Sequence, residues 1–111
     1  MIPGSLDLPT IWRGCDYGAV TLKWKDGNGN PMNLNGYTPF AMANNLYNLN
    51  PVVTDADNGV TQISVPKAQT SLMKLGVMSW DWIWRRDTPE FVYPPFLSGK
   101  IPVKEPTTVI P

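Results

Sequence analysis

The segment from Asp26 to Asn30 has the residue types and the spacing found in calcium-binding loops. Asp26, Asn28 and Asn30 form the D-x-N-x-N pattern that opens an EF-hand loop. Such a loop also requires a glycine at its sixth position and a bidentate glutamate at its twelfth. Those positions hold Pro31 and Tyr37. Because the segment also contains an Asp-Gly and an Asn-Gly pair, which favour the positive φ of tight turns, it is predicted to be a hairpin corner without a metal.

Side chains suited to catalysis are few. The chain has no histidine, which excludes serine or cysteine triads that use an imidazole, and also histidine-ligated zinc sites. Cys15 therefore has no histidine to activate it. Asp81 and Glu90 are the carboxylates that come nearest to a glycosidase pair, but a surface charge pair with Arg85 and Arg86 is the simpler explanation for Asp81. Neither GxGxxG nor GxxxxGK[ST] occurs. The sequence predicts no enzyme activity, no cofactor and no metal.

Three tryptophans are the most distinctive local feature. Trp80, Trp82 and Trp84 alternate with other residues in SWDWIWRR, which places all three on one face of a strand. They can form the core of a small sandwich, because each indole buries a large apolar area. They can also form a protein interface, or a platform that stacks on sugar rings. Under the last two interpretations these three residues are the candidate interaction site.

The composition limits the classes of partner. A chain of 111 residues has room for one domain, residues 1–111, with one modest core. Nine basic and nine acidic residues are scattered and give a net charge of zero, which argues against nucleic acid or an anionic membrane as the main partner. No apolar run reaches the roughly 18 residues of a membrane span, and the first residues lack the pattern of a signal peptide. The single cysteine favours synthesis in a cytoplasm.

Short segments with period-two alternation are separated by the turn residues of a chain with twelve prolines and nine glycines. Strands are expected over residues 19–25, 37–43, 52–54, 59–65, 79–86 and 96–103, with a short helix over 67–75 that Pro66 opens. The pattern predicts an all-β fold, a small antiparallel β-sandwich of the immunoglobulin-like or jelly-roll-like kind. Residues 1–9 and 104–111 are expected to be extended arms, and one or the other of them is expected to become ordered only against another chain.

The order of several motifs resembles a group of small bacteriophage structural proteins. That group has an "RG-D" element, a strand, a turn of the form D-x-x-G-x-P-x-(D/N)-L-x-G-(Y/W) and a second strand. The matching residues are Arg13, Gly14 and Asp16 in the first element, and Asp26, Gly29, Pro31, Asn33, Leu34, Gly36 and Tyr37 in the turn. The later segments "GVTQISVPKAQTSLMKLGVMSWDWIWRR" and "FLSGKIPVKEPTT" are similar to the group's closing strands. The best-known relative is the N-terminal domain of the siphophage baseplate upper protein.

The resemblance implies a structural role in a phage virion, as a tail or baseplate adaptor that docks neighbouring particle proteins. Baseplate upper proteins continue into a linker and a second domain, whereas this sequence stops at Pro111, which favours an adaptor, cap or decoration subunit over a direct carrier of receptor proteins. The implied partners are other virion proteins and further copies of the chain in a ring. Two alternatives remain open at this point: a head decoration subunit, and a small carbohydrate-binding module that uses Trp80, Trp82 and Trp84.

Overall fold

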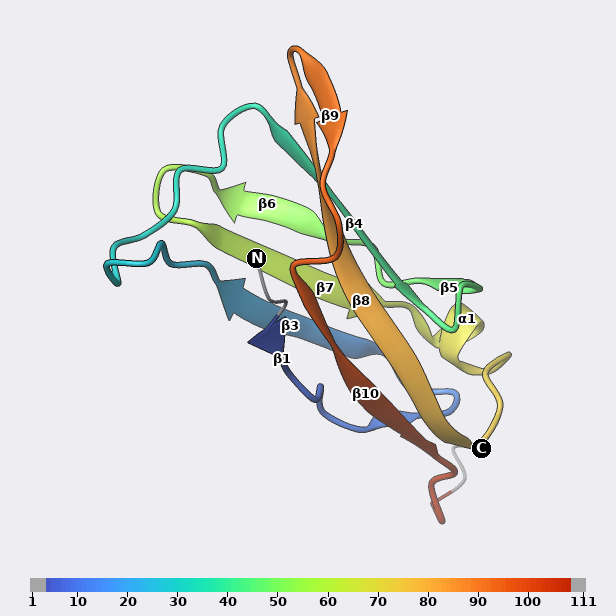
Figure 1. The fold of residues 1–111 in the computed structure, drawn as a ribbon. Helices are drawn as coiled ribbons and strands as arrows, with labels where there is room; N and C mark the ends of the chain where they lie inside the picture. Colours follow the sequence, from blue (N-terminus) through green and yellow to red (C-terminus); the bar gives the residue numbers. More distant parts are fainter. Residues whose placement is uncertain (1–3, 109–111) are drawn as a thin grey trace.

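The computed structural model describes residues 4–108, which form two β-sheets packed against each other (Figure 1). The strands are β1 (Gly4–Ser5), β2 (Ile11–Trp12), β3 (Tyr17–Lys23), β4 (Tyr37–Ala43), β5 (Tyr47–Asn48), β6 (Val52–Asp55), β7 (Val60–Val65), β8 (Gly76–Asp87), β9 (Glu90–Val92) and β10 (Leu97–Lys104). Helix α1 (Lys67–Thr70) lies between β7 and β8 in the sequence. Within these residues, no helix is long and apolar enough to cross a membrane.

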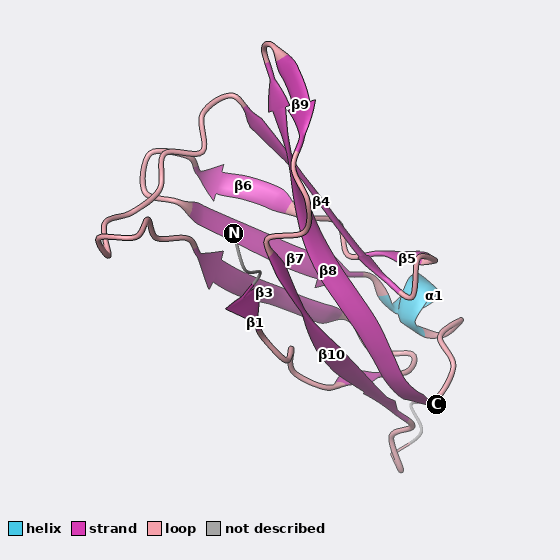
Figure 2. Cartoon of the chain, in the orientation of Figure 1, coloured by secondary structure: helices cyan, strands magenta, loops and turns pink. Residues whose placement is uncertain are grey.

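The larger sheet has the order β1-β10-β8-β4-β5, with β2 also pairing with β10 and β9 pairing with β8. The smaller sheet has the order β3-β7-β6. Strands and loops make up nearly all of the ribbon, with the helix at one end (Figure 2). The prediction of a small, mainly antiparallel β-sandwich with one short helix is therefore confirmed.

Strand β8 is the centre of the larger sheet, and small residues on its neighbours make room for its tryptophans. In the register of the sheet, Trp80 lies between Ala43 of β4 and Gly99 of β10. Trp82 lies beside Ala41 of β4. An indole fills far more volume than a methyl group, so large side chains on the central strand alternate with small ones beside them and the layer packs without overlap.

The observed strands follow the predicted ones closely, whereas the helix is shorter. The predicted strand over residues 37–43 is β4, and residues 79–86 lie within the longer β8. The helix ends at Thr70 and not at residue 75. After Thr70, backbone hydrogen bonds join residues three positions apart. The N–H of Leu72 donates to the carbonyl of Gln69, and that of Met73 donates to the carbonyl of Thr70. This tighter turn carries the Met73 side chain into the core.

Of the two arms, the N-terminal one is ordered within its own chain over residues 4–8. These residues run along β10 of their own chain as an edge strand, in parallel orientation. Three backbone N–H groups donate at 2.9 Å, from Gly4 to Phe96, from Leu6 to Ser98 and from Leu8 to Lys100. Leu8 is also buried in the core, so the cost of ordering the segment is offset by hydrogen bonds and apolar burial within the chain.

The rest of the two predicted arms lies partly outside the described residues and partly in contact with Arg13. Residues 1–3 and 109–111 lie outside the described residues. At the start of the C-terminal arm, Lys104 accepts a hydrogen bond from the backbone of Arg13 at 3.0 Å. The Arg13 side chain then forms an ion pair with Glu105 at 3.1 Å. Both contacts lie on the surface and hold residues 104–105 to the start of the chain.

Tyr17 connects β3 to the N-terminal segment and makes stability depend on pH. Its hydroxyl donates to the carbonyl of Pro9 at 2.9 Å, and burial raises the pKa of Tyr17 to about 12. The unfolded chain loses this proton near pH 10, so between about pH 10 and 12 the folded state binds more protons and stability falls as pH rises. We expect a loss of about 1–2 kcal/mol over that window, measured by urea denaturation. Tyr17→Phe should show a smaller loss, and equal losses in both proteins would contradict this assignment.

Gly36 lies in the turn before β4 with a φ of 83°, as expected from its place before a strand. No atom lies within 4 Å of the position that a Cβ would occupy, so a side chain there meets backbone strain and not a clash. Gly36→Val should lower the free energy of unfolding by about 2–3 kcal/mol, because a β-branched residue at positive φ is strongly disfavoured. The matched variant Gly29→Ala, at a φ of 82° and equally uncrowded, should cost about 1 kcal/mol. Equal denaturation midpoints for the two variants would refute this prediction.

Candidate interaction surface

The three tryptophans of β8 lie in the core of the sandwich. Trp80, Trp82 and Trp84 expose 2%, 0% and 2% of their surface. Trp24, which follows β3, packs on two of them, with ring centroids 5.1 Å from Trp82 and 5.4 Å from Trp84. Of the three interpretations of this face, the structure therefore places the indoles in the core. An exposed interface or sugar platform at these positions would require the two sheets to separate.

The indole N–H groups of this core differ in their hydrogen bonding. Trp80 Nε1 donates to the carbonyl of Leu6, and Trp24 Nε1 donates to Thr61 Oγ1, both at 2.9 Å. Among the described residues, Trp82 Nε1 and Trp84 Nε1 are buried without an acceptor. Trp80 thus fixes the N-terminal segment to the core, while the other two donors remain without a partner.

The segment from Asp26 to Asn30 forms a closed turn. Asp26 Oδ1 accepts hydrogen bonds from the backbone N–H of Asn28 at 2.9 Å and of Asn30 at 3.0 Å. The Asp26 backbone N–H donates to the carbonyl of Asn30 at 2.8 Å. The carboxylate therefore stabilises the turn from inside, as aspartate commonly does at such corners. Across residues 4–108 no group of three or more His, Cys, Asp or Glu side chains is placed to hold a metal ion.

This geometry predicts that calcium has no effect on stability. A ligand that binds only the folded state must raise its stability by mass action. Because Asp26 already accepts two backbone hydrogen bonds, we expect the thermal midpoint to be unchanged by added calcium or by a chelator. Differential scanning calorimetry in both conditions measures this, and a calcium-dependent rise of several degrees would show that a metal binds.

The carboxylates considered for glycoside hydrolysis lie far apart. Glu90 pairs with Asp87 at the hairpin between β8 and β9, six residues along β8 from Asp81. Six residues of extended strand span roughly 20 Å, well beyond the roughly 5–9.5 Å that separate paired glycosidase carboxylates. Asp81 was expected to form a charge pair with Arg85 and Arg86. In the structure, Arg85 instead forms an ion pair with Asp87 at 3.2 Å.

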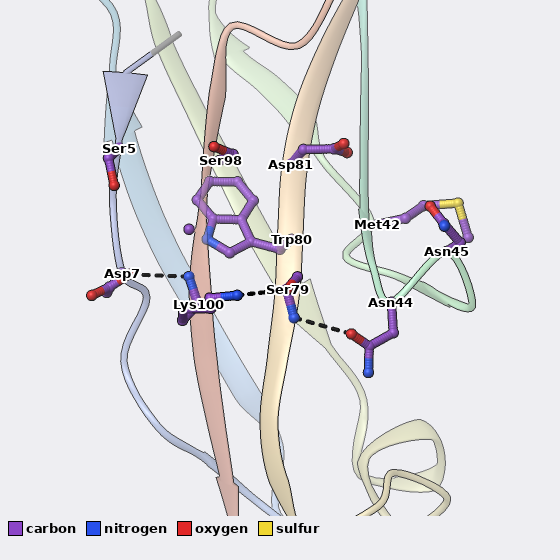
Figure 3. A pocket seen from close by; sticks show the side chains of 11 residues that line it. Ser5, Asp7, Met42, Asn44, Asn45, Ser79, Trp80, Asp81, Ser98 and Lys100 are labelled. Carbon is purple, nitrogen blue, oxygen red and sulfur yellow. Dashed lines mark hydrogen bonds between the residues drawn. The ribbon is translucent and has the colours of Figure 1, made fainter.

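A polar groove crosses the outer face of the larger sheet and includes Trp80, the one core tryptophan among its lining residues (Figure 3). It has a volume of about 500 Å³ and draws its lining from β1, β10, β8 and β4 and from adjoining loops. The lining residues are Ser5, Asp7, Met42, Asn44, Asn45, Ser79, Trp80, Asp81, Ser98, Gly99 and Lys100. We call this surface the outer groove.

Hydrogen bonds across the strands hold part of the outer groove in place. Lys100 Nζ donates to Ser79 Oγ at 2.9 Å, and the Lys100 backbone N–H donates to Asp7 Oδ1 at 3.0 Å. Asn44 Oδ1 accepts from the backbone N–H of Ser79 at 3.0 Å. The groove thus presents donors, acceptors and charges of both signs on rigid strands. It suits hydrogen-bonded contact with another molecule.

Sequence reasoning did not identify the outer groove, although part of its signal was visible. Ser79 and Asp81 alternate with the tryptophans, so the same period that sends the indoles inward sends these two outward. Asp7 lies in the segment that was expected to be a free arm. Its place beside Lys100 depends on a pairing between residues more than 90 positions apart, which no local pattern indicates.

Comparison with known proteins identifies the fold. No protein-family model matches the chain, and no curated protein matches it. Among solved structures, the chain is similar to the N-terminal domain of phage TP901-1 ORF48, with a TM-score of 0.54 and 18% sequence identity. The match covers 94% of this chain and 99% of that domain. The chain therefore shares the fold of that domain over nearly its whole length, and the resemblance suggested by the ordered motifs is confirmed at the level of the fold.

Proposed function

We propose that this protein is a structural component of a phage virion, a subunit of the tail or baseplate that docks neighbouring particle proteins. The observation that carries the proposal is the fold match to the N-terminal domain of phage TP901-1 ORF48, which spans 94% of one chain and 99% of the other. The order of the motifs along the sequence resembles that of small phage structural proteins and supports the same role. The role is structural and not catalytic, and the protein belongs in the assembled particle.

The surface offers features suited to contacts with other particle proteins. Besides the outer groove, one end of the sandwich exposes three large leucines, Leu46, Leu72 and Leu75. Leu46 lies in the turn before β5, and the hydroxyl of Tyr47 donates to the carbonyl of Leu72 at 3.1 Å, which holds that turn beside the segment after α1. Exposed apolar side chains gathered at one end are typical of protein contact surfaces.

Assembly through these surfaces would use several copies of the chain. In a closed ring with head-to-tail contacts, each copy offers two different surfaces to its neighbours. The outer groove and the leucine end adjoin at the turn that holds Asn44, Asn45 and Leu46, and together they would serve as one of these two surfaces. We propose a ring-type homo-oligomer in the particle, which native mass spectrometry of isolated tails can detect.

Quantitative mass spectrometry of purified particles, with heads and tails separated, tests the proposal. We expect the protein in the tail fraction at a fixed number of copies for each particle. A head fraction that contains all of it would instead support head decoration. Absence from both fractions would refute a virion role.

For the carbohydrate alternative, titration of the free protein with sugars should leave its tryptophan fluorescence unchanged, because Trp80, Trp82 and Trp84 are buried.

A further inference from the structure

The chain contains three Asn-Gly pairs, and all of them lie in connections between strands. Asn28-Gly29 and Asn35-Gly36 lie between β3 and β4, and Asn58-Gly59 lies between β6 and β7. An asparagine followed by glycine is chemically reactive, because glycine has no Cβ to keep its backbone nitrogen away from the asparagine side chain. The structure holds the three pairs differently, so their reactivities are expected to differ.

The reaction open to such a pair is loss of the side-chain amide. The backbone nitrogen of the glycine loses its proton and forms a bond to Cγ of the asparagine, and the bond from Cγ to Nδ2 breaks. Nδ2 takes up one proton through the solvent and leaves as ammonia, so a cyclic imide remains. Water then opens the imide at either of its carbonyls, which gives aspartate or isoaspartate. The net change consumes one water, releases one ammonia and transfers no electrons.

The Asn28-Gly29 pair is the least constrained of the three. Both residues are exposed, in the loop that extends from the sandwich between β3 and β4 (Figure 1). Within residues 4–108 the Asn28 side-chain amide forms no hydrogen bond, and its backbone N–H donates to Asp26 Oδ1. The Gly29 N–H donates to the carbonyl of Asp26 at 3.1 Å, and this single neutral bond has to open before the nitrogen attacks. No atom lies within 4 Å of the Cβ position of Gly29, so the pair has room to close into a ring.

The Asn35-Gly36 pair is also exposed, but its amide is held. Asn35 Nδ2 donates to Asp57 Oδ1 at 2.8 Å and to Asn33 Oδ1 at 2.7 Å. A hydrogen bond to an ionised carboxylate is roughly twice as strong as a neutral one. The Gly36 N–H has no acceptor in the described part of the chain, so the constraint acts on the amide. Because the amide must leave both partners before Cγ can face Gly36, this pair is expected to react more slowly than Asn28.

The Asn58-Gly59 pair is held at both residues. Asn58 Nδ2 donates to Asp55 Oδ2 at 2.8 Å. Gly59 is buried, and its carbonyl accepts from the backbone N–H of Trp24 at 2.7 Å. A Cβ on Gly59 would lie 2.6 Å from the carbonyl oxygen of Trp24 and 2.9 Å from that of Met32. The backbone of Gly59 therefore cannot turn toward the asparagine side chain without displacing its neighbours, and this pair is protected.

We propose that Asn28 is a site of spontaneous deamidation in the folded protein, with water as the reactant. The same reaction is slower at Asn35 and is suppressed at Asn58. Each event adds one negative charge to a chain whose formal net charge is zero. The isoaspartate product also lengthens the backbone inside the turn that Asp26 stabilises. The inference does not depend on the virion role.

Peptide mapping by mass spectrometry tests the proposal on the full chain, incubated at neutral pH and physiological temperature in water labelled with heavy oxygen. The label marks only those carboxylates that form during the incubation. Chymotrypsin cleaves after Trp24 and Leu34, which separates Asn28 from the other two asparagines. We expect labelled aspartate and isoaspartate at Asn28 at a rate at least about tenfold above that at Asn58. In urea, where the turns are lost, the three rates should converge.

Two variants make the test specific to these contacts. Gly29→Ala adds a Cβ beside the attacking nitrogen and should slow the reaction at Asn28 severalfold without changing the rate at Asn35. Asp57→Ala removes the carboxylate that holds the Asn35 amide and should raise the rate at Asn35 severalfold without changing that at Asn28. Circular dichroism confirms that each variant is folded. The proposal is overturned if Asn28 reacts no faster than Asn58 in the folded protein, if Gly29→Ala leaves its rate unchanged, or if Asp57→Ala speeds Asn28 and Asn35 alike.

Discussion

Replacing Trp82 by alanine is expected to lower the free energy of unfolding by about 3–5 kcal/mol, the range for truncating a large buried aromatic side chain. Trp82 is completely buried, and its ring centroid lies 5.1 Å from that of Trp24 and 5.3 Å from that of Trp84. The variant removes the middle of this aromatic cluster and leaves a cavity between the sheets. Urea denaturation followed by far-ultraviolet circular dichroism measures the change.

Trp12→Ala is the matched control, because Trp12 is 44% exposed and lies at the edge of the larger sheet. It should cost about 1 kcal/mol or less. If Trp82→Ala leaves the variant unfolded, Trp82→Phe gives a measurable intermediate. That substitution removes no hydrogen bond, since Trp82 Nε1 has no acceptor among the described residues. Equal costs for the two alanine variants would show that Trp82 is not at the centre of the core.

Gly99→Ala should displace the N-terminal edge strand and lower the free energy of unfolding by about 2 kcal/mol or more, a typical cost of overpacking. A Cβ at position 99 would overlap the carbonyl oxygen of Leu6 and lie 3.0 Å from Trp80 Nε1. The nearest obstacle is backbone and cannot rotate away, so the hydrogen bond from Trp80 to Leu6 must break. Hydrogen exchange of the Leu6 and Leu8 amides, which bond to β10, measures the displacement directly.

Gly27→Ala is the control for Gly99→Ala, because no atom lies within 4 Å of its Cβ position. It should leave both the denaturation midpoint and the exchange of the two leucine amides near the wild-type values. If the Gly99→Ala protein also keeps slow exchange at Leu6 and Leu8, the N-terminal segment does not cross over Gly99. The earlier expectation of a free arm would then be correct.

The sequence predicted those parts of the fold whose causes are local. Period-two alternation indicated that Trp80, Trp82 and Trp84 share a face, and the Asp-Gly and Asn-Gly pairs indicated the turn after β3. Alternation alone could not decide whether the tryptophan face is core or surface. That depends on the second sheet, which brings Trp24 against the indoles.

The N-terminal strand could not be predicted because its cause is distant. Residues 4–8 contain one glycine, and their alternation of polar and apolar residues covers only Ser5 to Leu8, which indicates an extended arm and not a strand. They are ordered because β10 offers a free edge, Gly99 leaves room for Leu6, and Trp80 supplies a donor. The outer groove follows from the same pairing, since Asp7 reaches Lys100 only once this strand is in place.

Electron microscopy of intact particles, labelled with gold-conjugated antibodies against the purified domain, tests the proposed virion role most directly. The particles are those produced from the genome that encodes this chain. We expect gold at the tail, at the baseplate end, and none on particles from which the gene has been deleted. Gold confined to the head, or labelling no greater than on the deletion particles, would contradict the proposed role in the tail or baseplate.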